Sequence, residues 1–410
     1  MIANSKDDYV IRFSRLRKFG QFLDFVQEWK ECHAGDVTYR FLLSISWVLI
    51  FSACTVSSPS VRTITARADA SVTPSPTIAV PTATYIATPT ITLPSPTPTL
   101  APSVPRPLLE IPLAGRVTTS RAEFSGLAWY GDYLVLLPQF PTRFGWGDGA
   151  LFVLDRAEID AFVDGTNPGP LTPRPLPVDA PGLRAAIPGW EGFESIVFDG
   201  ERVYLTIEAS LSSGMLGWIV AGRVEPDLSA VHIDAASAVS ITPQADLGNM
   251  TDEAIVMIGS GDDANLLTIY EANGWLVNSQ PVAHRFAADL TPLASLPLPS
   301  VEYRITDATR ADENGRFWAI NYFYPGDVKL KPGSDPLVRL IVKNLPQVER
   351  LVEFQISDDR VRFSGTPPVH LQLLEADARN WEGIVRLDDR GFLLVTDTHP
   401  RTILAFVAKP

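Results

Sequence analysis

The sequence predicts an all-β fold: a five-bladed β-propeller with four antiparallel strands per blade, closed between its N- and C-terminal strands. Three observations support this prediction. Residues 108–410 contain the same hairpin pattern five times, successive hairpins start 54 to 75 residues apart, and a third strand-like run follows each hairpin. No helical periodicity competes with these strands. Short antiparallel strands repeated in this way are typical of a propeller.

Composition divides the 410-residue chain into three parts. Residues 1–54 form an N-terminal extension that contains a 13-residue apolar run at 41–53. Residues 55–107 are rich in Thr, Ser and Pro, and eleven prolines preclude helices and sheet ladders there. We therefore predict a disordered, extended stalk. Residues 108–410 are the predicted propeller.

The apolar run at 41–53 is too short for a membrane-spanning helix, which needs about 20 residues, but it fits a signal peptide. Its end, with Ser52 and Ala53 before Cys54, resembles the lipobox of bacterial lipoproteins, although Phe51 replaces the usual aliphatic residue. The resemblance implies lipidation of Cys54 and an exported protein anchored to the outer face of the bacterial membrane or envelope. An uncleaved N-terminal anchor is the alternative. The true start is either Met1 or Val37.

The predicted propeller is acidic and lacks cysteine. Residues 109–410 carry 24 Lys and Arg against 40 Asp and Glu, so we expect no nucleic-acid partner. Cys32 and Cys54 both precede the stalk, which excludes a disulfide, a thiolate zinc site and a cysteine nucleophile from the propeller. The motifs of P-loop NTPases, nucleophile-elbow hydrolases and zincins are absent as well.

Each hairpin is bracketed by two polar residues. The residues entering the first strands are Ser125, Glu194, Glu253, Asp307 and Glu382. Those leaving the second strands are Gln139, Glu208, Glu271, Asn321 and Asp397. Both positions lie on one face, because the strands of a hairpin are antiparallel. Glu191 competes with Glu194, since the residues around it resemble those around Glu382, but the spacing favours Glu194.

The remaining strands complete the blades. Third strands are predicted at residues 150–154, 217–220, 274–277, 338–342 and 402–406. The last repeat ends after three strands. Residues 108–113 are free to supply its fourth strand, which would close the ring between the two ends of the domain.

The first strand of every blade lines the axis of a propeller, so we expect the five entering residues to converge there. Four carboxylates at one place repel, and they must take up protons or hold a cation. Ca²⁺ favours six to eight oxygen ligands, whereas the lack of His and Cys in the set disfavours zinc. The predicted metal ligands are Ser125, Glu194, Glu253, Asp307 and Glu382. The alternative is that these acids accept hydrogen bonds from backbone amides that join the blades.

A five-bladed propeller with these entering residues is similar to the calcium-activated nucleotidase (apyrase) family. The resemblance implies an axial Ca²⁺ and hydrolysis of nucleoside di- and triphosphates. Asp307 stands where the family has Ser, and residues 138–144 replace the family's acidic loop after the first hairpin. Residues 192–200 also look like the phytase-like esterase propellers of bacterial envelopes.

The loops after the second strands share the face of the predicted metal and offer catalytic candidates. His399 is the expected general acid or base, because it follows Asp397 by two residues. Arg143 and Arg401 are the expected phosphate-binding cations. Further loop candidates are Trp146, Asp148, Tyr322, Tyr324, Asp327, Lys329 and Lys331. The alternative for each of them is an exposed loop residue that serves solubility.

Two functions follow from this pattern. The first is a Ca²⁺-dependent hydrolase of phosphate esters or anhydrides, or of other esters. The second is a non-catalytic binding module with a structural metal, which recognises an envelope glycan or protein. A phosphohydrolase needs at least two of Arg143, Lys329, Lys331 and Arg401 to point at the metal. We expect a monomer that reaches the membrane through lipid on Cys54.

Overall fold

The computed structural model describes residues 104–409, apart from residues 146, 325, 331–334, 336, 338–347 and 375–377. The predicted signal peptide, Cys54, most of the stalk, Trp146, Lys331 and the strand predicted at 338–342 lie outside the described residues. Within the described ranges, no helix is both long and apolar enough to cross a membrane.

The described chain is all-β, as predicted, and its strands follow the five sequence repeats. Repeat one contains β2 (Phe124–Tyr130), β3 (Tyr133–Pro138), β4 (Ala150–Asp155) and β5 (Arg174–Asp179). Repeat two contains β6 (Trp190–Asp199), β7 (Arg202–Leu211), β8 (Gly214–Val224), β9 (Val231–Ile233) and β10 (Val239–Ile241). Repeat three contains β11 (Asp252–Ile258), β12 (Asn265–Tyr270), β13 (Val282–Ala287) and β14 (Pro292–Pro297).

Repeat four contains β15 (Arg304–Ala308), β16 (Arg316–Phe323), β17 (Val348–Ile356), β18 (Val361–Phe363) and β19 (Val369–His370). Repeat five contains β20 (Trp381–Leu387), β21 (Gly391–Thr396) and β22 (Leu404–Ala408). The fourth strand of that sheet is β1 (Leu109–Ile111), which pairs antiparallel with β22 through Leu109 opposite Phe406. The segment expected to complete the last repeat therefore does lie in its sheet.

The short helices lie between strands. The α-helices are α3 (Arg156–Val163) and α4 (Leu183–Ala186). The 3-10 helices are η2 (Gly115–Thr118), η3 (Pro141–Arg143), η4 (Ala235–Ser237), η5 (Gly261–Asp263) and η6 (Val328–Leu330). The tight hairpin turns use glycine in the left-handed region, for example Gly200 at φ 57° and Gly315 at φ 69°.

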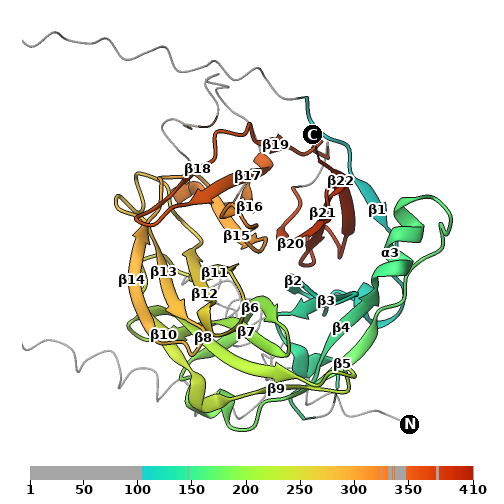
Figure 1. The fold of residues 1–410 in the computed structure, drawn as a ribbon, viewed down its shortest axis with the longest axis horizontal. Helices are drawn as coiled ribbons and strands as arrows, with labels where there is room; N and C mark the ends of the chain where they lie inside the picture. Colours follow the sequence, from blue (N-terminus) through green and yellow to red (C-terminus); the bar gives the residue numbers. More distant parts are fainter. Residues whose placement is uncertain are drawn as a thin grey trace, which may run out of the picture. The chain divides into compact units, whose positions relative to one another are not determined.

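The sheets surround a central axis (Figure 1). The first strands of the repeats lie nearest the centre: β2 contacts β6 and β20, β11 contacts β6 and β15, and β15 contacts β20. These five strands therefore form a closed cycle of contacts. Repeats one and two are further joined by a parallel pairing of β5 with β9, so that an eight-strand path runs from β2 to β6 and its two ends pack together.

The core lies between neighbouring repeats. Five hydrophobic clusters of the described residues each join two repeats. Val135 shares a cluster with Phe193, Ile255 with Ile219, and Leu127 with Leu393. The other two clusters join repeats three and four and repeats four and five. Burial on both faces of each sheet is what the apolar strand sequences require.

Some predicted elements differ from the structure. The third strand of repeat three is β13, and residues 274–277 form a turn in which Trp275 is 64 % exposed. The prediction was wrong because an apolar run does not by itself distinguish a strand from an exposed turn. β13 instead buries Ala283 and Phe286. The helix α3, which packs Ile159 into the core, was not predicted.

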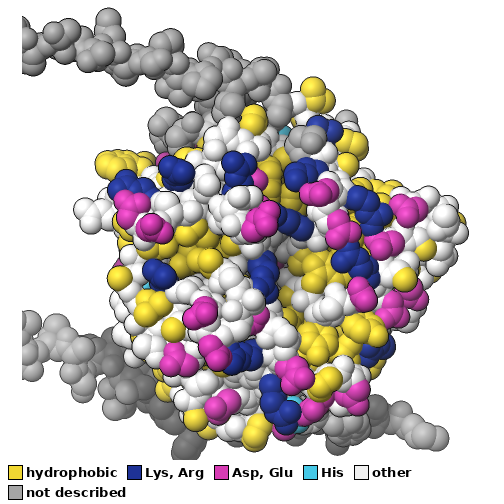
Figure 2. Space-filling model, viewed as in Figure 1, with side chains coloured by type: hydrophobic (Ala, Val, Ile, Leu, Met, Phe, Trp, Pro, Cys, Tyr) yellow, Lys and Arg dark blue, Asp and Glu magenta, His cyan; other side chains and the backbone are white. Residues whose placement is uncertain are grey.

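Charged side chains of both signs are interspersed on the face drawn in Figure 2. The net negative charge of the domain is therefore not gathered into one acidic patch on that face. Several carboxylates are instead buried, among them Glu194, Glu253 and Glu271.

Candidate functional site

The residues predicted to enter the first strands occupy β-bulges. The pairing register of the inner hairpins shifts at Ser125, Glu194, Glu253 and Glu382, and in repeat four it shifts across Thr306 and Asp307. A bulge inserts an unpaired residue and re-aims its side chain, and bulges are frequent beside functional sites. The sequence spacing had located these positions, although not the bulges.

Five glutamates gather at this end of the axis, and we call them the axial carboxylate cluster. They come from repeats two, three and five, and they are Glu194, Glu208, Glu253, Glu271 and Glu382. Each of the first four is at most 7 % exposed. Three of them were predicted as metal ligands. Glu208 and Glu271 were recognised only as the residues that leave the second strands.

Burial and mutual repulsion shift the pKa values of the cluster. Burial, with the charges of Glu271 and Glu191 added, raises the pKa of Glu194 to about 8, although a hydrogen bond from Gln139 at 3.0 Å opposes the shift. Burial, followed by the charges of Glu271 and Glu382, raises the pKa of Glu253 well above its usual value. Without a compensating cation, the neutral, protonated form of these carboxyl groups is therefore favoured over the charged form.

The pKa values of Glu208 and Glu382 are also raised well above the usual value, mainly by burial. For Glu208 the largest charge effect comes from Glu194, and for Glu382 it comes from Asp397. Tyr322 donates to Glu382 Oε1 at 3.3 Å, and burial raises the pKa of its own hydroxyl. Tyr322 also hydrogen-bonds to Asn380.

One cation compensates part of the charge. Arg304 donates to Glu271 Oε1 at 2.5 Å and binds both oxygens of Asp327, at 2.5 and 2.8 Å. Burial raises the pKa of Glu271, while Arg304 and a hydrogen bond with Glu253 oppose that rise. Arg304 was not among the predicted site residues. Its signal was an arginine three residues before Asp307, at the first position of β15.

Two oxygens of the cluster lie beside other carboxyl groups. Glu208 Oε2 and Glu271 Oε2 are buried and receive no hydrogen bond from an amide, hydroxyl or guanidinium donor of the described residues, while the carboxyl groups of Glu191 and Glu253 lie beside Glu208 and Glu271, respectively. A buried unpaired carboxylate oxygen is costly, and a cation or a proton would remove that cost. Among the described residues, however, no three His, Cys, Asp or Glu side chains already stand in the arrangement of a metal site. A bound cation would require these flexible glutamates to rotate toward one point.

The structure gives Ser125 and Asp307 a different environment from the cluster. Ser125 donates its hydroxyl to Phe193 O at 2.7 Å, and Thr306 donates in the same way to Trp381 O at 2.7 Å. Each acceptor precedes a cluster glutamate, so Thr306 is the counterpart of Ser125. Asp307 is therefore one residue deeper along the axis than the alignment of repeats predicted.

Asp307 accepts hydrogen bonds instead of joining the cluster. Its Oδ2 accepts from the amide of Ile384 at 2.9 Å, and its Oδ1 accepts from Ala308 N at 2.8 Å and from Ser195 Oγ at 3.1 Å. This is the arrangement stated as the alternative to a metal ligand. It applies to Asp307 because two of its donors belong to other repeats.

Two of the predicted cations pair with carboxylates outside the cluster. Arg143 donates to Glu123 Oε2 at 2.5 Å and its guanidinium lies 4.0 Å from the centre of the Phe140 ring. Arg401 is 61 % exposed and pairs with Glu110 of β1. Lys329 is exposed. Among the described residues, none of these three cations pairs with a cluster glutamate, which does not favour a phosphohydrolase.

His399 lies at the rim of the site. Its side chain is 62 % exposed, its amide donates to Asp397 Oδ1 at 2.6 Å, and its ring meets the Tyr324 ring edge-on. Asp397 is near enough to Glu382 to affect its pKa. Asp397 is thus next to the cluster, while His399 faces solvent.

Asp148, another predicted loop candidate, accepts a hydrogen bond from Ala180 N at 2.8 Å and holds a loop.

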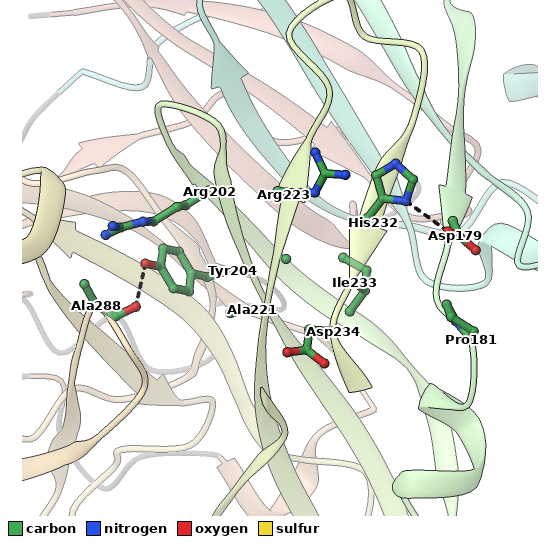
Figure 3. Close-up of a pocket in the computed structure, with 11 residues that line it drawn as sticks. Asp179, Pro181, Arg202, Tyr204, Ala221, Arg223, His232, Ile233, Asp234 and Ala288 are labelled. Carbon is green, nitrogen blue, oxygen red and sulfur yellow. Dashed lines mark hydrogen bonds and ion pairs between the residues drawn. The ribbon is translucent and has the colours of Figure 1, made fainter. Parts of the chain in front are cut away.

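A separate hollow of about 430 Å³ lies over β7, β8 and β9 (Figure 3). His232 Nδ1 is 2.9 Å from Asp179 Oδ2, and the Tyr204 hydroxyl donates to Ala288 O at 2.8 Å. Arg202, which Figure 3 shows turned away from His232, pairs with Asp262. The charged groups that line the hollow already have partners. Arg223 and His232 contact Glu225, Arg202 pairs with Asp262, and Asp234 accepts a hydrogen bond from the Ala236 amide. The cluster, by contrast, contains buried carboxylate oxygens without a hydrogen-bond donor.

Comparisons with known proteins add structural likenesses of low identity. No family model and no curated protein matches the chain. A glucose dehydrogenase structure is 12 % identical with a TM-score of 0.39, and the match covers 71 % of this chain and 98 % of that one. An endo-arabinanase from Bacillus licheniformis is 10 % identical with a TM-score of 0.41, and the match covers 72 % and 96 %. A structure described with the GH130 family of mannoside phosphorylases is 10 % identical with a TM-score of 0.41, covering 76 % and 98 %.

Proposed function

We propose that this protein is a five-bladed β-propeller that binds a divalent cation, Ca²⁺ by preference, at the axial carboxylate cluster. The observation that carries the proposal is the pair of buried oxygens, Glu208 Oε2 and Glu271 Oε2, which lie beside other carboxyl groups and receive no hydrogen bond from an amide, hydroxyl or guanidinium donor, in a cluster whose cationic partner among the described residues is Arg304. The closed cycle of inner strands supports the five-bladed form.

The cation would be held by oxygen ligands alone. Glu194, Glu253 and Glu382 occupy three bulges around the axis, and Glu208 and Glu271 supply further oxygens from the second strands. Such a set suits Ca²⁺, which accepts flexible geometry and carboxylate ligands. A bound cation would neutralise the cluster and tie repeats two, three and five together. Ser125 and Asp307 are not included, because their oxygens serve hydrogen bonds between repeats.

We favour a binding module with a structural cation over a phosphohydrolase. Phosphate chemistry needs cations around the metal, and Arg143 and Arg401 are paired with Glu123 and Glu110 instead. The exposed rim above the cluster, with Tyr324 and His399, is a surface suited to an envelope glycan or protein. Export and lipidation at Cys54 are part of the same proposal and rest on the sequence around residues 51–54.

A second candidate function is acid–base hydrolysis of a glycoside or ester. It is favoured by the Glu194 carboxyl, whose pKa of about 8 keeps a proton available at neutral pH beside other carboxyl groups. This candidate needs no phosphate-binding cation.

Calorimetric titration of the chelator-treated protein with Ca²⁺, Mg²⁺ and Zn²⁺ tests the cation site. We expect Ca²⁺ to bind more tightly than Mg²⁺ or Zn²⁺, and a free Ca²⁺ concentration of about 100 times Kd to stabilise the fold by about 2.7 kcal/mol. The double substitution Glu253→Gln and Glu382→Gln should abolish binding. The control Glu158→Gln with Glu313→Gln makes the same two replacements at exposed positions and should leave binding intact. Absence of Ca²⁺ binding to the unaltered protein would refute the site.

Nitrophenyl glycosides, phosphates and esters, each incubated with and without Ca²⁺, distinguish the two functions. The binding module predicts no turnover under either condition. Turnover of a glycoside or ester that disappears in Glu194→Gln, while Ca²⁺ binding persists, would favour the second candidate.

A further inference from the structure

The opposite half of the axis contains a cavity of about 240 Å³. It is lined by residues from repeats one, two, four and five, which include Leu127, Ile196 and Ile384 on the inner strands. These residues follow Ser125, Glu194 and Glu382 by two positions along their strands, so the cavity lies beyond the carboxylate cluster. The Ile384 amide is bonded to Asp307, which places that carboxylate between the two sites.

The cavity walls are mainly apolar, but two arginines line them. Arg310 follows β15 and Arg386 lies on β20. Both guanidinium groups are anchored by backbone carbonyls: Arg310 donates to Phe198 O at 3.3 Å, and Arg386 donates to Arg316 O at 2.9 Å. Carbonyl anchors hold a guanidinium in place without cancelling its charge.

Each of these arginines also has a carboxylate beside it, at a longer distance than the partners of Arg304. Arg310 donates to Gly259 O and lies 3.7 Å from Asp199, and Arg386 donates a long hydrogen bond to Asp312 Oδ2 at 3.4 Å. Arg304 in the other site lies 2.5 Å from both Glu271 and Asp327. Asp199 also accepts from the Gly261 amide at 2.7 Å. The two arginines therefore keep donor capacity for a further acceptor.

One of these donors is unsatisfied. Arg386 Nε is buried and has no hydrogen-bond partner among the described residues. The Arg386 side chain is 27 % exposed, so the rest of the guanidinium keeps its charge and donors available to an anionic ligand.

We propose that this cavity binds a small organic monocarboxylate, with its carboxylate at Arg386 and Arg310 and its apolar body against Leu127, Ile196 and Ile384. The volume equals that of about eight water molecules in the liquid, which suits a single ring or a short hydrocarbon chain. Apolar walls with a few convergent polar groups are typical of small-molecule sites. Inorganic phosphate would leave the apolar walls unused, and a neutral ligand would leave the arginines unused.

Benzoate is the probe, and titration calorimetry of the full chain in EDTA is the measurement, so that the result does not depend on the proposed cation site. We expect benzoate to bind, and benzyl alcohol and inorganic phosphate to bind at least about tenfold more weakly, since each lacks one half of the recognition. Arg386→Gln and Arg310→Gln should each weaken benzoate by about tenfold or more. Arg360→Gln, which removes an exposed arginine paired with Asp359, is the matched control and should leave the affinity unchanged.

A third variant tests the cavity without touching its charges. Ala308 lines the cavity and is 6 % exposed, so Ala308→Val should fill part of the space and weaken benzoate while both arginines remain. Unfolding curves of all variants establish that each is folded. The proposal fails if benzoate does not bind the unaltered protein, if benzyl alcohol or phosphate binds equally well, or if folded arginine variants bind benzoate as the unaltered protein does.

Discussion

Ser195 donates its hydroxyl to Asp307 Oδ1 at 3.1 Å, and this contact joins repeats two and four across the axis. Ser195 Oγ also accepts from the Ile255 amide of repeat three at 3.3 Å. Asp307 accepts in turn from the amides of Ile384 in repeat five and Leu127 in repeat one. Two side chains thus connect the inner strands of all five repeats. Most contacts in a ring of repeats join neighbours, so these shared hydrogen bonds stabilise the ring as a whole.

The substitution Asp307→Asn is predicted to weaken this centre. Burial raises the pKa of Asp307 well above its usual value, and the surrounding donors oppose that shift. An asparagine places an NH₂ group where an acceptor is needed, so that one buried amide hydrogen loses its partner. We expect the free energy of unfolding, measured in urea, to fall by about 1–3 kcal/mol.

The exposed substitution Asp358→Asn is the control, because it makes the same chemical change at the surface. If Asp307→Asn altered stability by less than about 0.5 kcal/mol, the range of ordinary surface substitutions, Asp307 would not be the acceptor that these contacts imply.

Stability of the metal-free protein should depend on pH in a specific direction. Burial and neighbouring charges raise the pKa of Glu194 from 4.5 to about 8 in the folded protein, and they also raise the pKa of Glu253. Between pH 4.5 and about pH 8 the folded state binds more protons than the unfolded state. The stabilisation is therefore fully present below about pH 4.5 and is lost as pH rises through about 8. Each proton contributes a slope of about −1.4 kcal/mol per pH unit.

Urea unfolding between pH 5 and pH 9 in EDTA measures this slope. Glu194→Gln removes one of the titrating groups and should flatten the slope, whereas Glu158→Gln on the exposed face of α3 should not. A stability that rises over this range would contradict the raised pKa values.

Much of the architecture could be predicted because strand spacing and hairpin turns are local properties of the chain. The position of β1 beside β22 followed from a count of strands, since repeat five ends after three. Residues 274–277 misled the prediction, because Trp275 and Leu276 are as apolar as a strand but lie exposed in a turn. Exposure depends on where the neighbouring repeat lies, which the local sequence does not encode.

The candidate site was predictable in part for a related reason. Glu194, Glu253 and Glu382 could be located, since each immediately precedes an apolar strand. Asp307 has the same sequence context, but the bulge in repeat four covers both Thr306 and Asp307 and shifts the carboxylate one residue along the axis. Bulges arise from pairing with the second strand. The pairing of Arg304 with Asp327 likewise depends on a loop conformation that no spacing reveals.

Removal of Arg304 should be costly, and Ca²⁺ should reduce the cost. Arg304→Gln leaves Glu271 and Asp327 without their buried partner, and breaking such an arrangement typically costs about 3–5 kcal/mol. A cation bound at the cluster would neutralise Glu271 by another route. We therefore expect the loss of unfolding free energy to be smaller in saturating Ca²⁺ than in EDTA.

Arg304→Lys serves as the second variant if Arg304→Gln does not fold, because it keeps the charge and loses the bidentate contact with Asp327. Arg202→Gln breaks the exposed pair with Asp262 and is the control. Equal losses with and without Ca²⁺ would place any bound cation away from Glu271.

The strand β1, which completes the sheet of repeat five, has one buried and one exposed apolar side chain. In β1, Ile111 is 2 % exposed, packs in the cluster shared by repeats one and five, and lies opposite Leu404, whereas Leu109 is 43 % exposed. Ile111→Ala should lower the free energy of unfolding by about 2–5 kcal/mol, because it removes buried methyl groups and leaves a cavity. Leu109→Ala makes a similar truncation on the same strand and should cost much less. Urea unfolding of both variants measures the difference, and equal effects would mean that β1 does not bury its inner face between the first and last repeats.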